Sequence, residues 1–399
     1  MARRTFALVA AVASLFASAI DLDDSGSLKL TGFYNLTAGK ILSGKDSEYN
    51  LQNWQYQQWH CPCTIQNWEY VGVYEKYKGW ETTPESLVGA QLKKTFSDTL
   101  SATVQVVSRG DNTNYRPYTP TVDWAYLSWK PSADSAWTFQ GGRKRIPLYY
   151  YSDYLYIGYA YPWVRPAPDV YGWPIYAYDG VNAIYETELG AGWNLTANGW
   201  YGNFKQKSDA YDTRIYANNF FYPPPPGDVN ESWKDIWGTY ASVSNGIFEV
   251  RGMMMVYHDS VWQNVGGTDT IWTNKVHTRI MGIAGNVDYK NWLVRTEFDR
   301  FEQNPTSPAS FVYDYLLAGV GYRIGDFTPM YTFSHYTTEP NSTPQSVEGR
   351  NTSYFSLRWD FHKNMALKVQ YDITKDKSQY PFPFWGDSDL LSVSLQGIF

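Results

Sequence analysis

The sequence has no long apolar run beyond its first residues, and its mean hydropathy is −0.46. A transmembrane helix needs about 20 consecutive, mostly apolar residues, so a helical membrane protein is excluded. Clustered basic residues are missing as well: 33 lysines and arginines face 39 acidic residues, and the formal net charge is −6. Binding to a phosphate backbone demands basic clusters, so we expect no nucleic-acid partner.

Histidine is scarce, and the five histidines are scattered along the chain. Only the run His258, Asp259 and Ser260 brings together the residue types of a hydrolase. Adjacent residues of a strand point to opposite faces, so this run makes no triad without a sharp turn. We therefore predict no catalytic residue and no enzyme activity.

Cysteine is limited to Cys61 and Cys63, which follow His60 in a stretch that we expect to face an oxidising exterior. The spacing permits a tight disulfide, a free pair of thiols or a small metal site. Three ligands on one loop are a weak metal signal, so we favour the disulfide, in a strained and easily reduced ring. We expect no metal and no other cofactor.

The first 19 residues are typical of a secretory signal peptide. Arg3 and Arg4 form a charged start, residues 6–16 form an apolar run, and Ala17, Ser18 and Ala19 form a small-residue cleavage site. The apolar run is too short for a membrane anchor. Cleavage would leave a mature domain of residues 20–399 and, by removing two arginines, would take the formal charge from −6 to −8.

Aromatic residues, in contrast, are abundant: they make up 18% of the chain, with 18 Trp and 35 Tyr. Transmembrane β-barrels need such residues in two interfacial girdles. Each strand of such a barrel has about 10 residues, which alternate between lipid-facing apolar and lumen-facing polar side chains. The run 99–109 shows this pattern, because Val104 and Val106 alternate with Thr103 and Gln105.

Short turns join the strand-like runs in pairs. They fall at residues 97–98, 131–135, 189–192, 244–246, 289–291, 325–326 and 361–364. These seven hairpins, a first strand at 27–38 and a last strand at 387–399 give 16 strands, the even number of a closed bacterial barrel. The long connections fall between the hairpins, at residues 39–86, 110–120, 146–178, 204–232, 259–275, 302–310, 337–350 and 375–386.

The separation of long loops from short turns argues against a soluble β-sandwich, which has no reason to place every long connection at one end. The sequence therefore predicts an all-β fold, a transmembrane antiparallel β-barrel. The run 68–76 is also strand-like, but a further spanning strand would break the up-and-down order. We place that run within the first loop.

The last strand carries a resemblance to a known family. Leu391, Val393 and Leu395 alternate with polar residues, and the chain stops at Phe399. This pattern resembles the terminal strand that Gram-negative outer-membrane porins present to the barrel assembly machinery. The resemblance implies a homotrimer in the outer membrane, surrounded by lipid bilayer and lipopolysaccharide. It also implies that the third external loop, here residues 146–178, folds into the barrel and forms the constriction.

That third loop is rich in aromatic residues and proline, so it is neither a solvated linker nor a helix. We expect its rings to be half-buried against the wall and half-exposed to the channel, where they narrow the pore. The candidate constriction residues are Tyr154, Tyr156, Tyr159, Trp163, Asp153, Arg165 and Asp169.

Alternation of side chains also predicts which charges face the lumen. The candidate lumen-wall residues are Lys93, Arg109, Arg251, Arg295, Arg358, Lys368, Glu249, Glu297, Asp299, Asp360 and Asp372. They either act on a passing solute or pair with one another across neighbouring strands. The basic run 143–145 has two interpretations as well: it steers anions into the mouth or binds lipid phosphate.

These observations predict a channel for the passive diffusion of small hydrophilic solutes, with modest selectivity from the aromatic loop. The alternatives are a channel selective for sugars or aromatic acids and, third, an outer-membrane hydrolase. The chain length disfavours a TonB-dependent transporter, because a 22-stranded barrel with its plug needs a longer chain.

Overall fold

The computed structural model describes residues 19–45, 64–65, 73–74, 79–110, 117–171, 177–206, 229–265, 267–304, 311–340, 349–378 and 387–399. These residues are mostly in β-strands, and the helical elements among them are single turns. No helix in this part of the chain is long and apolar enough to cross a membrane. The predicted signal peptide lies outside the described residues except for Ala19.

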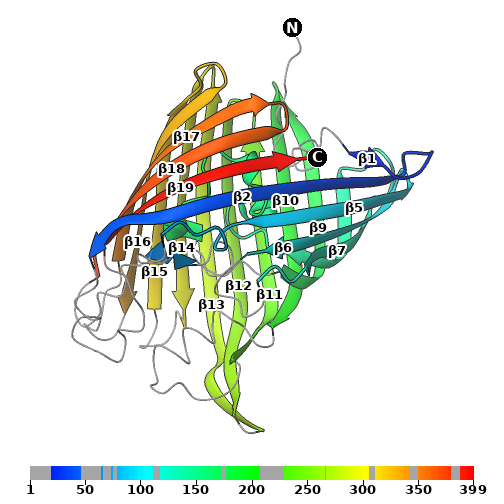
Figure 1. Cartoon of the computed structure of the whole chain (residues 1–399). Coiled ribbons are helices and arrows are strands. Elements are labelled where there is room, and N and C mark those ends of the chain that lie inside the picture. Colours follow the sequence, from blue (N-terminus) through cyan, green and yellow to red (C-terminus); the bar gives the residue numbers. More distant parts are fainter. Residues whose placement is uncertain are drawn as a thin grey trace.

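Sixteen antiparallel strands form a closed ring (Figure 1). Each strand pairs with the next along the chain, and the last strand pairs back with the first. The ring consists of β2 (Leu28–Lys45), β5 (Leu87–Ser97), β6 (Leu100–Arg109), β7 (Thr121–Trp129), β8 (Trp137–Arg145), β9 (Ala177–Gly190), β10 (Trp193–Gln206), β11 (Val229–Ser244), β12 (Phe248–Val265), β13 (Thr268–Tyr289), β14 (Trp292–Gln303), β15 (Phe311–Tyr322), β16 (Phe327–Pro340), β17 (Gly349–His362), β18 (Met365–Asp376) and β19 (Asp387–Ile398).

The alternation of polar and apolar residues along each strand corresponds to the inner and outer faces of the ring. In β19, Ser392 and Gln396 are fully buried on the inward face, whereas Leu391, Val393 and Leu395 lie on the opposite, partly exposed face. A membrane barrel needs this polar interior and apolar exterior. The predicted fold class, the count of 16 strands and the seven short turns are confirmed.

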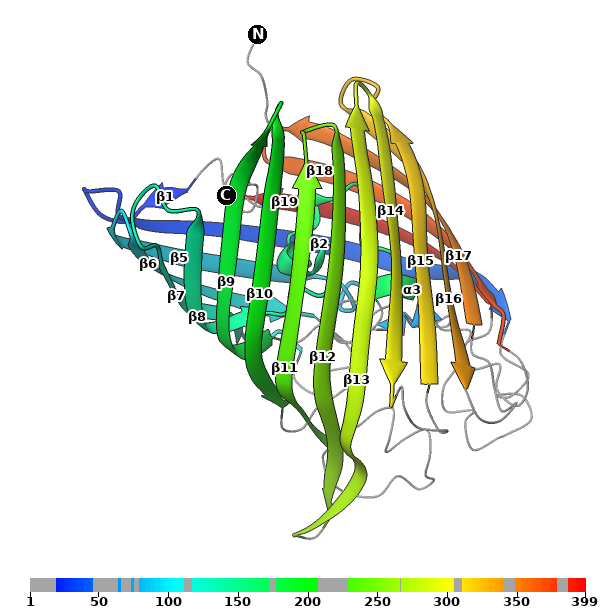
Figure 2. The same ribbon diagram turned by 180° about the vertical axis from the view of Figure 1, so that it is seen from behind.

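Two predicted boundaries are wrong. Residues 259–275 are not a long loop, because β12 and β13 continue and remain paired as far as Val265 and Thr268. This hairpin reaches beyond its neighbours (Figure 2). The first strand runs to Lys45 rather than to residue 38. Both extensions lie at the long-loop end of the barrel, where polar and glycine residues interrupt the apolar alternation.

Part of the strand-like run 68–76 is described. Strand β4 (Val73–Tyr74) pairs with β3 (Thr64–Ile65) in a separate two-stranded sheet. These residues therefore do not belong to the ring, as predicted, and the rest of that run lies outside the described residues.

The seam of the barrel joins the two ends of the chain. The Phe399 N–H donates to the Gly32 carbonyl at 2.9 Å, and the Gly32 N–H donates to the Phe399 carbonyl at 2.7 Å. The Phe399 ring lies over Gly32, where a Cβ atom would be only 2.2 Å from it. Strand β1 (Ile20–Asp21) pairs with β2 beyond the end of β19. The terminal residue is thus part of the ring closure.

Candidate functional site

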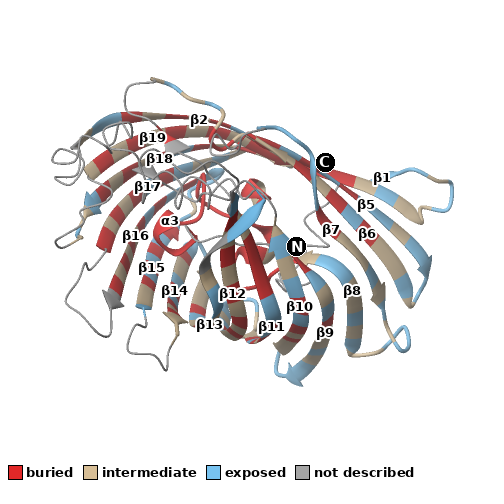
Figure 3. Ribbon diagram, turned by 90° about the horizontal axis from the view of Figure 1, so that it is seen from below, coloured by how far each residue is buried: buried red, intermediate tan, exposed pale blue. Residues whose placement is uncertain are grey.

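In the end view, residues 146–171 of the connection between β8 and β9 lie inside the ring (Figure 3). These residues are called the loop segment below. It contains three short turns, η2 (Ser152–Tyr154), η3 (Gly158–Ala160) and α3 (Pro168–Tyr171). Its prolines lack the N–H group that strand pairing requires, so the segment does not form a further strand. Turns and side-chain contacts hold it instead.

Basic residues of the wall hold the loop segment by its backbone. Lys368 is fully buried, and its ammonium donates to the carbonyls of Gly158 at 2.7 Å, Tyr161 at 2.5 Å and Trp163 at 2.9 Å. The Arg358 guanidinium donates to the Tyr159 and Tyr161 carbonyls at 2.6 and 3.0 Å. Because these carbonyls belong to irregular backbone, the cations satisfy acceptors that no strand partner reaches.

Arg251 makes a similar contact from the other side of the ring. Its guanidinium, on β12, donates to the Pro147 carbonyl at 2.7 Å. The same side chain lies 4.0 Å from the Asp153 carboxylate. The segment is thus held by cations of β12, β17 and β18 together.

Arg165 is the most enclosed charge of the loop segment, with no exposed surface. It forms buried ion pairs with Glu85 and with Asp372, each at 2.5 Å. Burial opposes the charge on Arg165, but the two carboxylates outweigh it, so its pKa lies well above the ordinary value. Tyr74 also donates to Glu85, so this site joins the first and third loops to β18.

A second ion pair holds the end of the segment. Asp169, in α3, pairs with Arg350 of β17 and accepts a hydrogen bond from the Ser334 hydroxyl of β16. Both charged side chains are buried. A buried ion pair is costly to break by removing one partner, because the other charge then stays in a poorly solvated place.

Carboxylates of the wall bind both ends of the segment. Glu297 of β14 accepts the Tyr150 N–H at 2.8 Å and the Tyr171 hydroxyl. Glu249 of β12 accepts the Tyr150 hydroxyl at 2.8 Å. Burial and the nearby Glu297 raise the pKa of Tyr171 well above its ordinary value, so this hydroxyl stays a donor at neutral pH.

The aromatic rings of the segment are more buried than predicted. Tyr154, Tyr156 and Trp163 are only 8%, 5% and 1% exposed, so the expectation of half-exposed rings is wrong for them. The Tyr151 ring contacts those of Tyr154 and Trp163 at 5.8 and 5.4 Å, edge to face. The rings pack the segment against itself and the wall. Among the predicted aromatic residues, Tyr159 is partly exposed.

The predicted constriction charges also differ in exposure. Arg165 and Asp169 are buried in ion pairs, whereas the Asp153 side chain is 30% exposed. The sequence could not show the ion pairs, because their partners lie about 80 to 200 residues away along the chain. Glu85, Arg350 and Tyr74 were not among the predicted site residues.

Most predicted lumen-wall charges do face inward, but they contact protein groups. Arg295 pairs with Asp288 at 3.2 Å, and Arg358 pairs with Asp360 at 2.6 Å. The Arg109 guanidinium lies 5.2 Å from the centre of the Tyr156 ring. Asp299 is buried on β14, on the same face as Glu297. Lys93 differs from these residues because it is exposed.

The basic run 143–145 is not a cluster. Arg143 lies on the outer face in an exposed pair with Asp179 at 2.7 Å. Lys144 points the other way and donates to Gln140 at 2.5 Å. Arg145 is buried against Asp123. The interpretation of the run as a single steering or lipid-binding patch is therefore wrong, and of the three residues only Arg143 is exposed on the outer face.

Burial of the inner wall depends on the distance from the short turns. On β2 and β16 to β19 the inward polar residues, such as Thr332, are almost completely covered. On the opposite side, Asn182 of β9 and Asn198 of β10 are also only 5% and 4% exposed. The exposed inward residues of β9, Glu186 and Glu188, lie nearer the short turn at residues 189–192.

The predicted disulfide candidates Cys61 and Cys63 lie outside the described residues. The described part of the chain contains no group of three or more His, Cys, Asp or Glu residues that could hold a metal ion.

The comparisons with solved structures find outer-membrane barrels. In-vitro folded OmpT, an outer membrane protein of Vibrio cholerae, aligns with 96% of this chain and 100% of its own, at a TM-score of 0.55 and 12% identity. OmpF of Salmonella typhi, in complex with daunomycin, aligns with 95% and 100% at 0.53 and 12%. The anion-selective porin of Comamonas acidovorans aligns with 94% and 99% at 0.51 and 12%. No family model and no curated protein matches this sequence.

The closed ring of 16 strands and these alignments define the class: the chain has the fold of a Gram-negative outer-membrane porin. The similarity in fold extends along nearly the whole chain, since each of the three alignments covers at least 94% of it.

Proposed function

We propose that the protein is an outer-membrane channel through which small hydrophilic solutes diffuse passively. The observation that supports this most strongly is the closed barrel with a polar inner face, part of which stays exposed along β9. A barrel of 16 strands is wide enough for an aqueous channel unless a plug fills it. The loop segment lies inside the ring (Figure 3) and so narrows the channel.

The proposed constriction lies at the height of the loop segment, where Asn182 and Tyr240 of the wall are only 5% and 3% exposed. Asp153 is the charged residue of the segment that keeps appreciable exposure there, at 30% of its side chain. Glu186 and Glu188, exposed on the inward face of β9 nearer the short turn at residues 189–192, add acidic groups along the passage. These three carboxylates favour cations over anions, and the buried charges under the segment have little influence on the passing ion.

The alternative of a channel selective for sugars or aromatic acids required exposed rings. Tyr154, Tyr156 and Trp163 are buried, so they offer no free face for a solute to stack on. A specific binding site for these solutes therefore has no support in the described residues. We also propose that the protein is not a hydrolase: Asp259 is buried, whereas His258 is 43% exposed, so these neighbours do not meet as a catalytic pair.

The proposal is tested by reconstituting the protein in a planar bilayer and measuring conductance and reversal potential in a salt gradient. We expect stepwise conductance with a modest cation preference. Replacing Glu186 and Glu188 together by Gln should shift the reversal potential toward anions, because two exposed carboxylates leave the lumen wall. The matched control is Glu302→Gln, which removes a carboxylate paired on the outer face with Arg279. Equal reversal potentials in all three proteins would contradict the acidic passage.

The cellular setting follows from the same class. We propose export by the signal peptide, cleavage after residue 19 and insertion by the barrel assembly machinery, with lipid bilayer and lipopolysaccharide around the barrel. We also propose a homotrimer, since one of the aligned structures is the trimer form of OmpT of Vibrio cholerae. Sizing of the unheated, detergent-extracted protein checks the trimer, and a monomer would count against it.

A further inference from the structure

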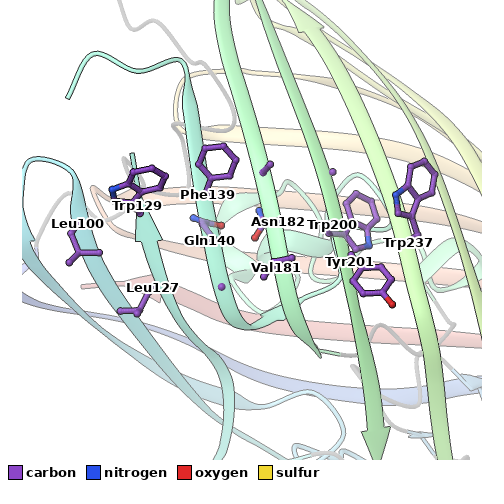
Figure 4. Close-up of a pocket in the computed structure, with 13 residues that line it drawn as sticks. Leu100, Leu127, Trp129, Phe139, Gln140, Val181, Asn182, Trp200, Tyr201 and Trp237 are labelled. Atoms are coloured by element: carbon purple, nitrogen blue, oxygen red, sulfur yellow. The ribbon is translucent and has the colours of Figure 1, made fainter. Parts of the chain in front are cut away.

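A buried carboxyl group of the inner wall, that of Asp299, contrasts with the outer wall. The outer wall carries an apolar groove of about 580 Å³ over β6 to β11, lined by exposed side chains such as Leu127 and Val181 (Figure 4). A lipid-facing wall requires exposed apolar side chains of this kind. Asp299, in contrast, is a titratable group that the fold encloses, and it is only 1% exposed.

The Asp299 carboxyl group forms no hydrogen bond and no ion pair with any described residue, and its Oδ2 atom is fully enclosed. The side chain lies across Gly282, its partner on β13. A Cβ atom on Gly282 would lie 1.9 Å from Oδ1 of Asp299 and 2.6 Å from the methyl group of Met253. The carboxyl group is therefore confined to one place, close to an apolar neighbour.

The loop segment covers this carboxyl group. Tyr149 is 0% exposed, and its hydroxyl also lacks a hydrogen-bond partner in the part of the chain that the structure describes. Burial, then Asp299 and Glu297, raise the pKa of Tyr149 well above its ordinary value, so this hydroxyl lies near both carboxyl groups and stays protonated. The Tyr149 ring packs edge to face on Tyr171 at 5.4 Å. Water thus reaches Asp299 only if the segment moves.

The charged groups around Asp299 do not balance a second carboxylate. Glu297 lies two residues away on the same face of β14. The guanidinium of Arg251, on β12, donates to the Pro147 carbonyl at 2.7 Å and forms no ion pair with either carboxyl group. Arg295, also on this face of β14, is held in its own ion pair. An ionised Asp299 would therefore lie near a like charge, without a cation in contact.

The remaining titratable groups packed around Asp299 are phenols, which are uncharged at neutral pH. They belong to the loop segment, β12 and β15: Tyr149, Tyr171, Tyr257 and Tyr315. An isolated carboxylate in so enclosed a place is very costly, and such a group takes up a proton instead. Asp299 is thus neutral while the loop segment covers it.

We propose that Asp299 is a proton-binding site and that its proton keeps the start of the loop segment against the wall. A neutral carboxyl group tolerates the cover of Tyr149, whereas an ionised one requires water. Protonation therefore stabilises the constricted state at lower pH, and ionisation at higher pH loosens it. The effect on conduction rests on the proposed channel function, but the proton site itself does not.

The test measures chymotrypsin cleavage at residues 149–151 and single-channel conductance of the whole folded barrel, at mildly acidic and at mildly alkaline pH. Each cleavage rate is divided by that of an unfolded peptide at the same pH, which removes the pH dependence of the protease. We expect severalfold faster cleavage and a higher conductance of the wild type at alkaline pH. Asp299→Asn cannot ionise, so it should stay protected and keep the lower conductance at both pH values.

The matched control is Asp314→Asn, which removes a carboxylate paired with Arg300 on the outer face of the neighbouring strand. It should keep the wild-type pH dependence. A wild type with the same protection and conductance at both pH values overturns the proposal, whether or not the variants fold. So does a pH dependence that survives in Asp299→Asn, because another group then carries the proton. A pH-dependent protection without any conductance would contradict the channel and support the proton site.

Discussion

Replacing Arg165 by Met should detach the loop segment from the wall. The variant leaves Glu85 and Asp372 buried without their common partner, and removal of one member of a buried ion pair costs about 3–5 kcal/mol. This corresponds to a roughly 10²- to 5 × 10³-fold larger population of detached segment. The effect is large because Arg165 holds the first loop, the third loop and β18 at one point.

Limited proteolysis with chymotrypsin measures this directly, because the segment is rich in aromatic residues that are buried when it is in place. The wild-type barrel should resist cleavage there, and Arg165→Met should be cut. The matched control is Arg143→Met, which breaks an exposed ion pair worth about 0–1 kcal/mol. Adding Glu85→Gln and Asp372→Asn to Arg165→Met should restore part of the protection. Equal protection in the wild type and Arg165→Met would refute the role of this ion pair.

Replacing Phe399 by Ser should reduce accumulation of the folded barrel in the outer membrane. The ring seats on Gly32 at the seam, and by resemblance it also ends the signal for the assembly machinery. The substitution should therefore lower the amount of folded barrel more than the conductance of the barrels that do fold. The amount of heat-modifiable barrel in outer-membrane fractions measures the effect.

Phe361→Ser provides the control for this prediction. Phe361 is 42% exposed at the short-turn end of β17, much like Phe399 at 40%, but it does not close the seam. Its loss should leave accumulation near the wild-type level. If Phe399→Ser accumulated as well as Phe361→Ser, the terminal residue would be an ordinary lipid contact.

The barrel could be predicted from the sequence because its pattern is local. Each strand alternates apolar and polar residues over about 10 positions, and tight turns such as that at Ser97 and Asp98 join the strands within a few residues. The hairpin at residues 259–275 was missed for the same reason. There, polar residues such as Asn264 and Asp269 interrupt the alternation, although the two strands stay paired.

The attachment of the loop segment could not be predicted, because it depends on contacts between distant parts of the chain. The sequence shows that Lys368 faces inward, but not that Gly158, Tyr161 and Trp163 offer it three carbonyls. Gly158 packs so closely that a Cβ would lie 2.5 Å from Asn35. The burial of the rings follows from these contacts. Composition alone left open whether the rings face the solute or the wall.

The most direct test of the account is the single-channel conductance of a variant that lacks residues 153–171. These residues contribute the rings, Arg165 and Asp169, and they cover the inner wall from β14 to β2. If they narrow the lumen, their removal should raise the conductance severalfold in a barrel that still shows the heat-modifiable, folded form. An unchanged conductance in that folded variant would mean that the loop segment does not constrict the channel.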